Sequence, residues 1–107
     1  HMALRAPPGA PFKAQGESVM EKVESVRARM AAFAKGIRSG AILAADGEPF
    51  TAILHIGIGG SDLGPRLVWD ALKPLKPAID LKFVANVDGG DFAQAAAGLD
   101  PARTLVI

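Results

Sequence analysis

The sequence contains no cysteine, no long hydrophobic run and no excess of either charge. The absence of cysteine excludes disulfide bonds and thiolate metal sites, and it suits the reducing cytoplasm, which is the expected location. No apolar run approaches the roughly 20 residues of a membrane-spanning helix, so no membrane partner is expected. The formal net charge is +1, and its scattered lysines and arginines argue against a nucleic-acid partner.

The length and composition of the chain suit one folded domain at most. The chain has 107 residues, of which 50% are hydrophobic and 21% are charged, a balance typical of globular proteins. Residues 1–17 are rich in proline and glycine, which predicts an extended N-terminal segment. Residues 18–107 are predicted to form an incomplete domain, in which one helix precedes a β-α-β-α-β unit.

The first predicted helix covers residues 18–39. Ser18 and Glu21 form a capping box at its start, and Gly40 suits a left-handed cap at its end. Apolar residues recur at helical spacing and predict one buried face. They are Val19, Val23, Val26, Met30, Phe33 and Ile37.

The rest of the chain alternates between strands and helices. Apolar runs at 51–58, 81–87 and 104–107 predict three strands of a parallel sheet covered on both faces, a three-layer α/β sandwich. A helix is predicted over 66–75, with Pro65 in its first turn and a shorter helix following the second strand. The residues predicted to be buried are Leu67, Val68, Ala71, Leu72 and Leu75 in the longer helix, and Phe92, Ala95, Ala96 and Leu99 in the shorter one.

A glycine-rich loop at 57–64 joins the first strand to the longer helix. Open α/β sheets bind ligands at such junctions, where glycines allow close approach and a helix N-terminus favours anions. Ser61 adds a hydroxyl donor, so the loop predicts a small anionic ligand such as a phosphate ester. The alternative is a tight turn that needs glycine only for packing.

Two commoner phosphate-binding patterns do not fit this loop. The dinucleotide fingerprint G-x-G-x-x-G would require glycine where Asp62 stands, and a carboxylate there would repel a pyrophosphate. The nucleoside-triphosphate loop would require Lys followed by Ser or Thr after Gly64, where the sequence has Pro65 and Arg66.

The motif IGIGGSDLGP resembles the signature of the glucose-6-phosphate isomerase family. Further segments resemble successive parts of that family, so that the resemblance covers nearly the whole chain. They are ALRAP at the start, VMEKV in the first helix, FVANVDG at 83–89 and the closing LDPARTLVI.

This resemblance implies a partial sugar-isomerase domain from an enzyme that interconverts glucose 6-phosphate and fructose 6-phosphate through a cis-enediol. It implies a sugar-phosphate substrate, no cofactor, no metal and a homodimer for the full-length parent. Gly60 and Ser61 match the family's substrate-contacting pair, and Gly59 shapes the turn. The family's catalytic motifs and its Ser-Lys-Thr phosphate loop belong to later parts of the family chain. No catalytic residue is therefore assigned, and this chain alone is expected to be inactive.

Two other functions stay open at this point. One is a non-catalytic, sugar-phosphate-binding regulatory module with the same type of fold. The other is a dinucleotide-binding domain, against which the missing third glycine argues.

Several polar and aromatic residues are interpreted as structural. His55 is expected to be a hydrogen-bonded strand histidine and Asp62 a helix-start residue, while Asp88 and Asp91 are expected to cap a helix, with a place at the rim of a pocket as the alternative. Asp46 and Glu48 are turn residues, and Trp69 lies off the predicted buried stripe and is a candidate contact for another domain or subunit. No pair of residues has metal-ligand spacing.

Overall fold

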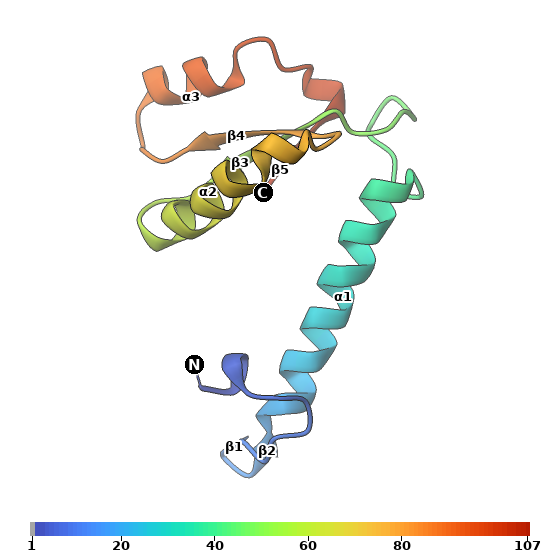
Figure 1. The fold of residues 1–107 in the computed structure, drawn as a ribbon, viewed down its shortest axis with the longest axis vertical. Coiled ribbons are helices and arrows are strands. Elements are labelled where there is room, and N and C mark those ends of the chain that lie inside the picture. The colour runs from blue at the N-terminus through green and yellow to red at the C-terminus, as the bar shows by residue number, and fades with distance from the viewer. Residues whose placement is uncertain (1) are drawn as a thin grey trace. The chain divides into compact units, whose positions relative to one another are not determined.

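The computed structural model describes residues 2–107, so His1 lies outside the described residues. Internal contacts divide the chain into two compact units, one that ends at Ala41 and one from Ile42 to Ile107 (Figure 1). Among the described residues, no helix combines the length and the apolar character needed to cross a membrane.

The first unit begins with short elements that were not predicted. A 3-10 helix covers Met2–Arg5, and the strands β1 (Lys13–Ala14) and β2 (Glu17–Ser18) pair antiparallel. The loop between them is Gln15-Gly16, and both residues have positive φ, at 51° and 84°. Such a two-residue loop matches the right-handed twist of a hairpin. The expectation of an extended segment over 1–17 therefore misses a helical turn and a hairpin.

Helix α1 (Val19–Ser39) ends at the predicted cap and begins with the Ser18 half of the predicted capping box; within residues 2–107 the Glu21 carboxylate accepts no hydrogen bond from Ser18. The Glu21 backbone N–H donates to Ser18 Oγ over 3.4 Å, and Gly40 has a φ of 72° at the other end. The predicted buried stripe is only partly confirmed, because Ile37 is buried but the middle of the stripe is exposed. The exposed residues there are Val26, Met30 and Phe33.

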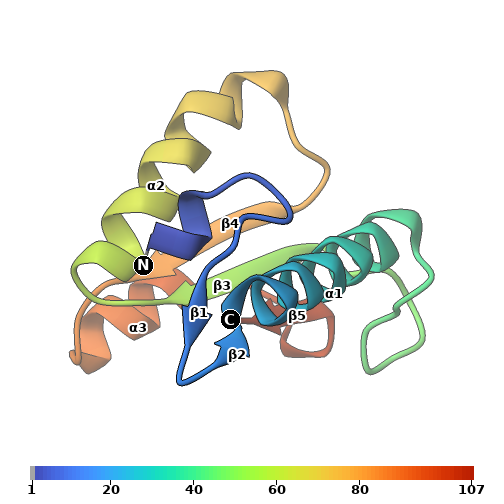
Figure 2. The same cartoon turned by 90° about the horizontal axis from the view of Figure 1, so that it is seen from below.

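The second unit is built on a parallel sheet of β3 (Ala52–Ile56), β4 (Asp80–Val84) and β5 (Thr104–Val106). The strand order is β4-β3-β5, so the first strand of the unit lies in the centre (Figure 2). Each strand begins within one residue of its predicted first residue and ends one to three residues before its predicted last residue. The continuous apolar runs thus predicted their type and order correctly.

Two helices cover opposite faces of this sheet. Helix α2 (Gly60–Leu72), extended by a 3-10 turn at Lys73–Leu75, connects β3 to β4, and α3 (Gly89–Ala96) with a 3-10 turn at Pro101–Arg103 connects β4 to β5. The two crossovers run in opposite directions along the sheet, so right-handed connections place their helices on opposite faces (Figure 1). The predicted three-layer α/β arrangement is confirmed.

Alternate residues of the strands belong to different layers. Leu54 and Val84 are buried on the α3 face, and they form the core of this unit together with Ala44 and Ala52. His55 pairs in register with Phe83 on the α2 face, where both side chains lie below the start of α2. The central strand β3 therefore contributes side chains to both of the layers that the helices form.

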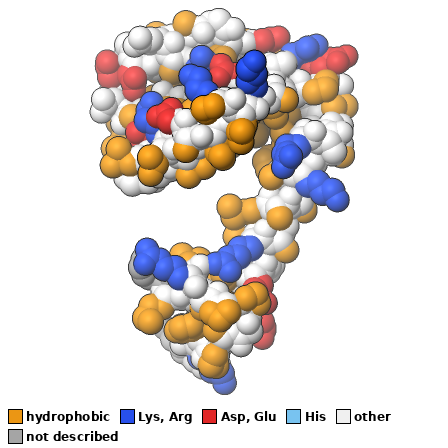
Figure 3. All heavy atoms as spheres, viewed as in Figure 1, with side chains coloured by type: hydrophobic (Ala, Val, Ile, Leu, Met, Phe, Trp, Pro, Cys, Tyr) orange, Lys and Arg blue, Asp and Glu red, His pale blue; other side chains and the backbone are white. Residues whose placement is uncertain are grey.

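Helix α2 turns a different face to the sheet from the one predicted. Asp62 is buried and both Arg66 and Trp69 are half-buried, whereas the predicted apolar stripe is exposed. Leu67 is 71% exposed, and hydrophobic side chains gather on the surface of this unit (Figure 3). Helical periodicity identifies the face that avoids water but not the neighbour that covers it, and no neighbour within residues 42–107 covers this one. In α3, Phe92 is likewise exposed, whereas the predicted Ala95, Ala96 and Leu99 are half-buried.

Candidate functional site

The glycine loop lies at the carboxyl end of the central strand β3. The strand order β4-β3-β5 corresponds to the first three strands of a doubly wound sheet, with α2 and α3 on opposite faces. In such sheets the ligand crevice opens between the first and third strands, beyond their carboxyl ends. Those strands are β3 and β5 here, so the loop borders the position where a ligand is expected.

Three glycines of the loop serve different purposes. A Cβ at Gly57 would lie 2.9 Å from Ser61 Cβ and 3.1 Å from His55 Nε2, so this position needs glycine for packing. Gly59 has φ 60° and ψ −120°, which other residues adopt only under strain. A Cβ at Gly60 would meet nothing within 4 Å. Packing alone therefore explains Gly57 but not Gly60, where a glycine weakens the helix without any internal benefit.

The start of α2 presents unpaired donors. Within residues 2–107 the backbone N–H groups of Ile58, Gly59 and Gly60 donate no hydrogen bond, whereas the N–H groups of Asp62 and Leu63 both donate to the Gly59 carbonyl. The Ser61 hydroxyl also has no partner in this part of the chain, and the residue is exposed. Unpaired N–H groups at a helix N-terminus, with its positive end of the dipole, favour an anion.

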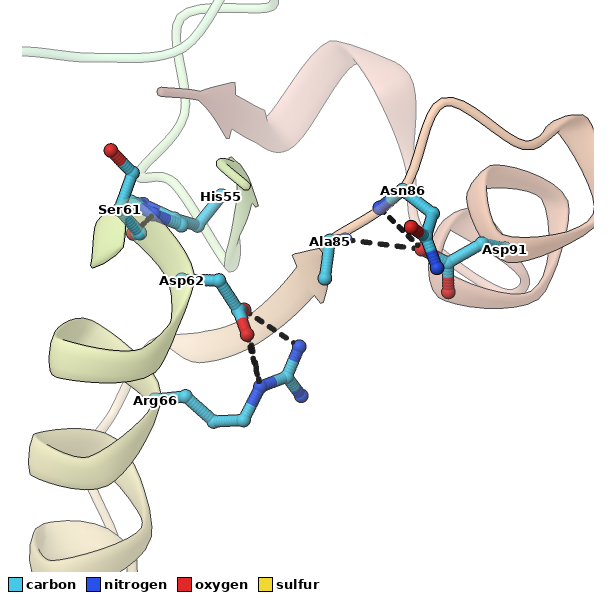
Figure 4. A network of polar contacts seen from close by, with 7 residues as sticks. All are labelled: His55, Ser61, Asp62, Arg66, Ala85, Asn86 and Asp91. Atoms are coloured by element: carbon cyan, nitrogen blue, oxygen red, sulfur yellow. Dashed lines mark hydrogen bonds and ion pairs between the residues drawn. The ribbon is translucent and has the colours of Figure 1, made fainter. Parts of the chain in front are cut away.

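The side chain of His55 forms a hydrogen bond with the backbone of this turn. Its Nε2 lies 2.8 Å from the Ser61 carbonyl oxygen, and since a carbonyl can only accept, the imidazole donates (Figure 4). Pro65 lies inside α2, not in a first turn as predicted, and it has no N–H to give to the carbonyl four residues earlier. That carbonyl is the one of Ser61. The prediction of a hydrogen-bonded strand histidine is confirmed, and the structure identifies its partner.

A partly buried ion pair holds the same turn to the sheet, with Asp62 buried and Arg66 half-exposed. Arg66 donates to both carboxylate oxygens of Asp62, with the shortest contact at 2.7 Å (Figure 4). Its guanidinium lies 4.6 Å from the centre of the Phe83 ring. Hydrogen bonding to Asp62 raises the pKa of Arg66 above its ordinary value. The structural role predicted for Asp62 is confirmed. Its charge is matched by Arg66, so the predicted repulsion of a pyrophosphate is weaker than the sequence suggested.

Two aspartates accept backbone hydrogen bonds just beyond the carboxyl end of β4. Asp88 accepts from the N–H groups of Gly90 and Asp91 and so caps α3 as predicted. Asp91 instead accepts from the backbone N–H groups of Ala85 and Asn86, at 3.1 and 3.2 Å, and so holds the loop that follows β4 (Figure 4). The capping role predicted for Asp91 is therefore wrong. Nothing in the sequence pattern distinguishes it from Asp88.

An open apolar pocket lies between the glycine loop and α3. Its volume is about 360 Å³, and its lining includes Ile56, Ile58, Val84, Asp88 and Phe92. Asp88, whose carboxylate caps α3, is thus also a residue of the pocket wall. Hydrophobic walls with a few polar groups at one end are typical of small-molecule sites.

The remaining candidates are structural in the described chain. Asp46 accepts from the Glu48 N–H and pairs with Arg103 at 2.8 Å, which stabilises the predicted turn. Trp69 is half-buried at the edge of the sheet, where it lines a pocket of about 290 Å³ beside β4. Residues 2–107 contain no group of three or more side chains suited to holding a metal ion.

Comparison with known proteins shows what the chain resembles. It matches the family model described as phosphoglucose isomerase over residues 1–107. It is 66% identical over 107 residues to the glucose-6-phosphate isomerase of Caulobacter vibrioides strain NA1000 / CB15N. It is 52% identical over 112 residues to that of Cupriavidus taiwanensis and 50% identical over 108 residues to that of Roseiflexus castenholzii. In each comparison the whole chain is covered but only 20% of the relative.

Proposed function

The chain belongs to the phosphoglucose isomerase family, and on this premise we propose that it supplies the glycine-loop part of a sugar-phosphate site to a glucose-6-phosphate isomerase. It spans about one fifth of the length of the relatives that it matches. The proposed activity of the longer protein is the interconversion of glucose 6-phosphate and fructose 6-phosphate. The chain by itself is proposed to be inactive.

One observation carries the proposal: Gly60 has open space where a side chain would stand, beside three unpaired N–H groups. A helix normally gains from alanine at such a position, so glycine there is best explained by a ligand that approaches the backbone. The loop borders the crevice that doubly wound sheets use for ligands.

Each proposed site residue has a separate role. Gly59 bends the chain into the helix, Gly60 leaves its N–H accessible, and Ser61 donates its hydroxyl to an oxygen of the sugar phosphate. These are contacts that bind and orient the substrate. The proton transfer between C2 and C1 needs a base and charge stabilisation. No residue of this chain is proposed for either task.

The wider setting is proposed on the same premise. We expect residues 18–107 to be part of a sugar-isomerase domain, preceded by the segment 1–17, in a cytoplasmic homodimer that needs no cofactor. The relatives are named as isomerases, which does not favour the alternative of a non-catalytic regulatory module. Neither does any feature of the loop favour the dinucleotide alternative.

The test uses a chimera in which this chain replaces the matched fifth of the Caulobacter vibrioides enzyme. Fructose 6-phosphate is supplied, and the glucose 6-phosphate formed is measured with a coupled dehydrogenase. We expect the chimera to be active and the 107-residue chain to be silent. Ser61→Ala should raise the KM of the chimera about tenfold, the loss expected for one hydrogen bond to a charged group.

Ser25→Ala is the matched control, because Ser25 lies exposed on α1 and should leave the KM unchanged. A chimera that folds but shows no activity would contradict the proposed function. An active chimera in which Ser61→Ala and Ser25→Ala behave alike would leave the family assignment intact but remove Ser61 from the site.

A further inference from the structure

We propose that His55 is a positioning residue for the sugar-phosphate site: its imidazole replaces the helical hydrogen bond that Pro65 abolishes and so holds Gly60 and Ser61 in place. This inference rests on the proposed function of the glycine loop. His55 itself does not touch the substrate.

The first step is the unpaired carbonyl. In an α-helix each carbonyl accepts from the N–H four residues later, and Pro65 has none to give to Ser61. A carbonyl left without a partner beside the sheet would be costly. The His55 Nε2–H fills the gap at 2.8 Å.

The second step is how closely the strand and the helix approach each other. Gly57 follows the strand that carries His55, and a Cβ there would lie 3.0 Å from the same Ser61 carbonyl. Only glycine therefore allows the first turn of α2 to come within reach of the imidazole. The histidine, the glycine and the proline form one arrangement around a single oxygen atom.

The third step is the orientation of the imidazole. The His55 ring rests against Phe83, with centroids 5.5 Å apart and planes tilted by 59°. Phe83 is also the ring over which Arg66 lies, and Arg66 pairs with Asp62, the neighbour of Ser61. The first turn of α2 is thus held to the sheet at two adjacent residues, once through its backbone and once through a side chain.

The consequence concerns binding. Ser61 offers its carbonyl to His55 on one side and its hydroxyl to the loop's open side, so a shift of this residue moves the proposed substrate contacts of Gly60 and Ser61 together. Loss of the imidazole donor should weaken sugar-phosphate binding more than it slows the chemical step, because no reacting group is altered.

The experiment is a double-mutant cycle in the chimera with His55→Phe and Pro65→Ala. Phenylalanine keeps a ring beside Phe83 but has no donor, and the Pro65→Ala change restores the helical N–H to the Ser61 carbonyl. We expect His55→Phe to raise KM about tenfold with kcat within about twofold of the parent. In the Pro65→Ala background the same change should raise KM less than about threefold.

Two further variants sharpen the test. His55→Gln keeps an N–H donor at similar reach and should recover most of the affinity. Ile53→Val removes one methyl group from the same face of β3 and should leave KM unchanged. If His55→Phe does not fold with Pro65 present, recovery of folding in the Pro65→Ala background supports the proposal. Failure to fold in both backgrounds overturns it.

The two hypotheses fail in different ways. An inactive but folded parent chimera refutes the proposed function, and the positioning role falls with it. An active parent chimera in which His55→Phe leaves KM unchanged, or raises KM equally with and without the Pro65→Ala change, refutes the positioning role alone.

Discussion

Replacing Gly60 by alanine should stabilise the fold and weaken ligand binding at the same time. Gly60 is the first residue of α2, its φ is not positive, and a Cβ there meets nothing within 4 Å. Alanine therefore fits without strain. It also reduces the freedom of the unfolded chain, which makes folding more favourable.

The size of the effect follows from that entropy. A compatible Gly→Ala change contributes about 0.4–1 kcal/mol of stability. For a domain of this size 1 kcal/mol corresponds to roughly 4–8 °C in Tm, so the expected rise is about 2–8 °C. The added methyl group occupies the space above the unpaired N–H groups. We expect a rise in KM of about tenfold or more, equivalent to roughly 1.4 kcal/mol.

Two neighbouring glycines serve as controls with the opposite sign. At Gly59 the backbone has φ 60° and ψ −120°, so Gly59→Ala should cost about 1–3 kcal/mol. At Gly57 a Cβ would stand 2.9 Å from Ser61 Cβ, so Gly57→Ala should also destabilise. Stability is measured by thermal unfolding of the 107-residue chain followed by circular dichroism, and KM in the chimera.

The reasoning would be refuted by either of two results. A Gly60→Ala chain that melts at a lower temperature than the parent would mean that Gly60 has an internal role after all. A Gly60→Ala chimera with the KM of the parent would mean that no ligand approaches this backbone.

Three further predictions follow from the same structure. The Arg103 guanidinium beside Asp46 lowers the pKa of that carboxyl. The pair therefore adds stability above the unfolded pKa of about 3.9 and loses it as pH falls through the lower folded pKa. Urea unfolding from about pH 2 to 6 should show Arg103→Gln less stable than the parent at the upper end and equal to it at the lower end. Asp62→Ala should lower the free energy of unfolding by about 1–3 kcal/mol in the same assay at neutral pH, because it removes the buried partner of Arg66. A change below about 0.5 kcal/mol would exclude a structural role for the pair. Leu67→Glu should alter the stability of the chain by less than about 0.5 kcal/mol, since Leu67 is exposed, and should reduce any self-association seen by sedimentation; a large loss of stability would show that the residue is covered.

The order of the elements could be predicted because each signal is local. A continuous apolar run indicates a strand covered on both faces, and a glycine cluster between such a run and a helical pattern indicates the loop. The caps at Ser18, Gly40 and Asp88 depend only on residues within four positions. The hydrogen bonds at these three caps confirm the predictions, except for the contact from the Glu21 carboxylate back to the Ser18 N–H, which the described residues do not form.

Contacts between distant residues could not be predicted in the same way. Pro65 has a clear meaning in sequence, since it removes a donor, but the atom that compensates belongs to His55 on a neighbouring strand. The face that α2 turns to the sheet was predicted from its leucines, whereas the structure uses Asp62 and Arg66. A polar pair at helical spacing looks solvent-exposed until the aromatic ring beneath it is known.

The alternation of side chains along β3 has a practical consequence for engineering. Ala52 and Leu54 pack in the layer of α3, while His55 between Leu54 and Ile56 serves the turn that carries Gly60 and Ser61. A library that varies only Ala52 and Leu54 would explore stability and leave the proposed contacts of Gly60 and Ser61 unchanged. Substitutions at His55 would instead alter the support of that turn while Ala52 and Leu54 stay constant, so the two properties can be evolved separately within five consecutive residues.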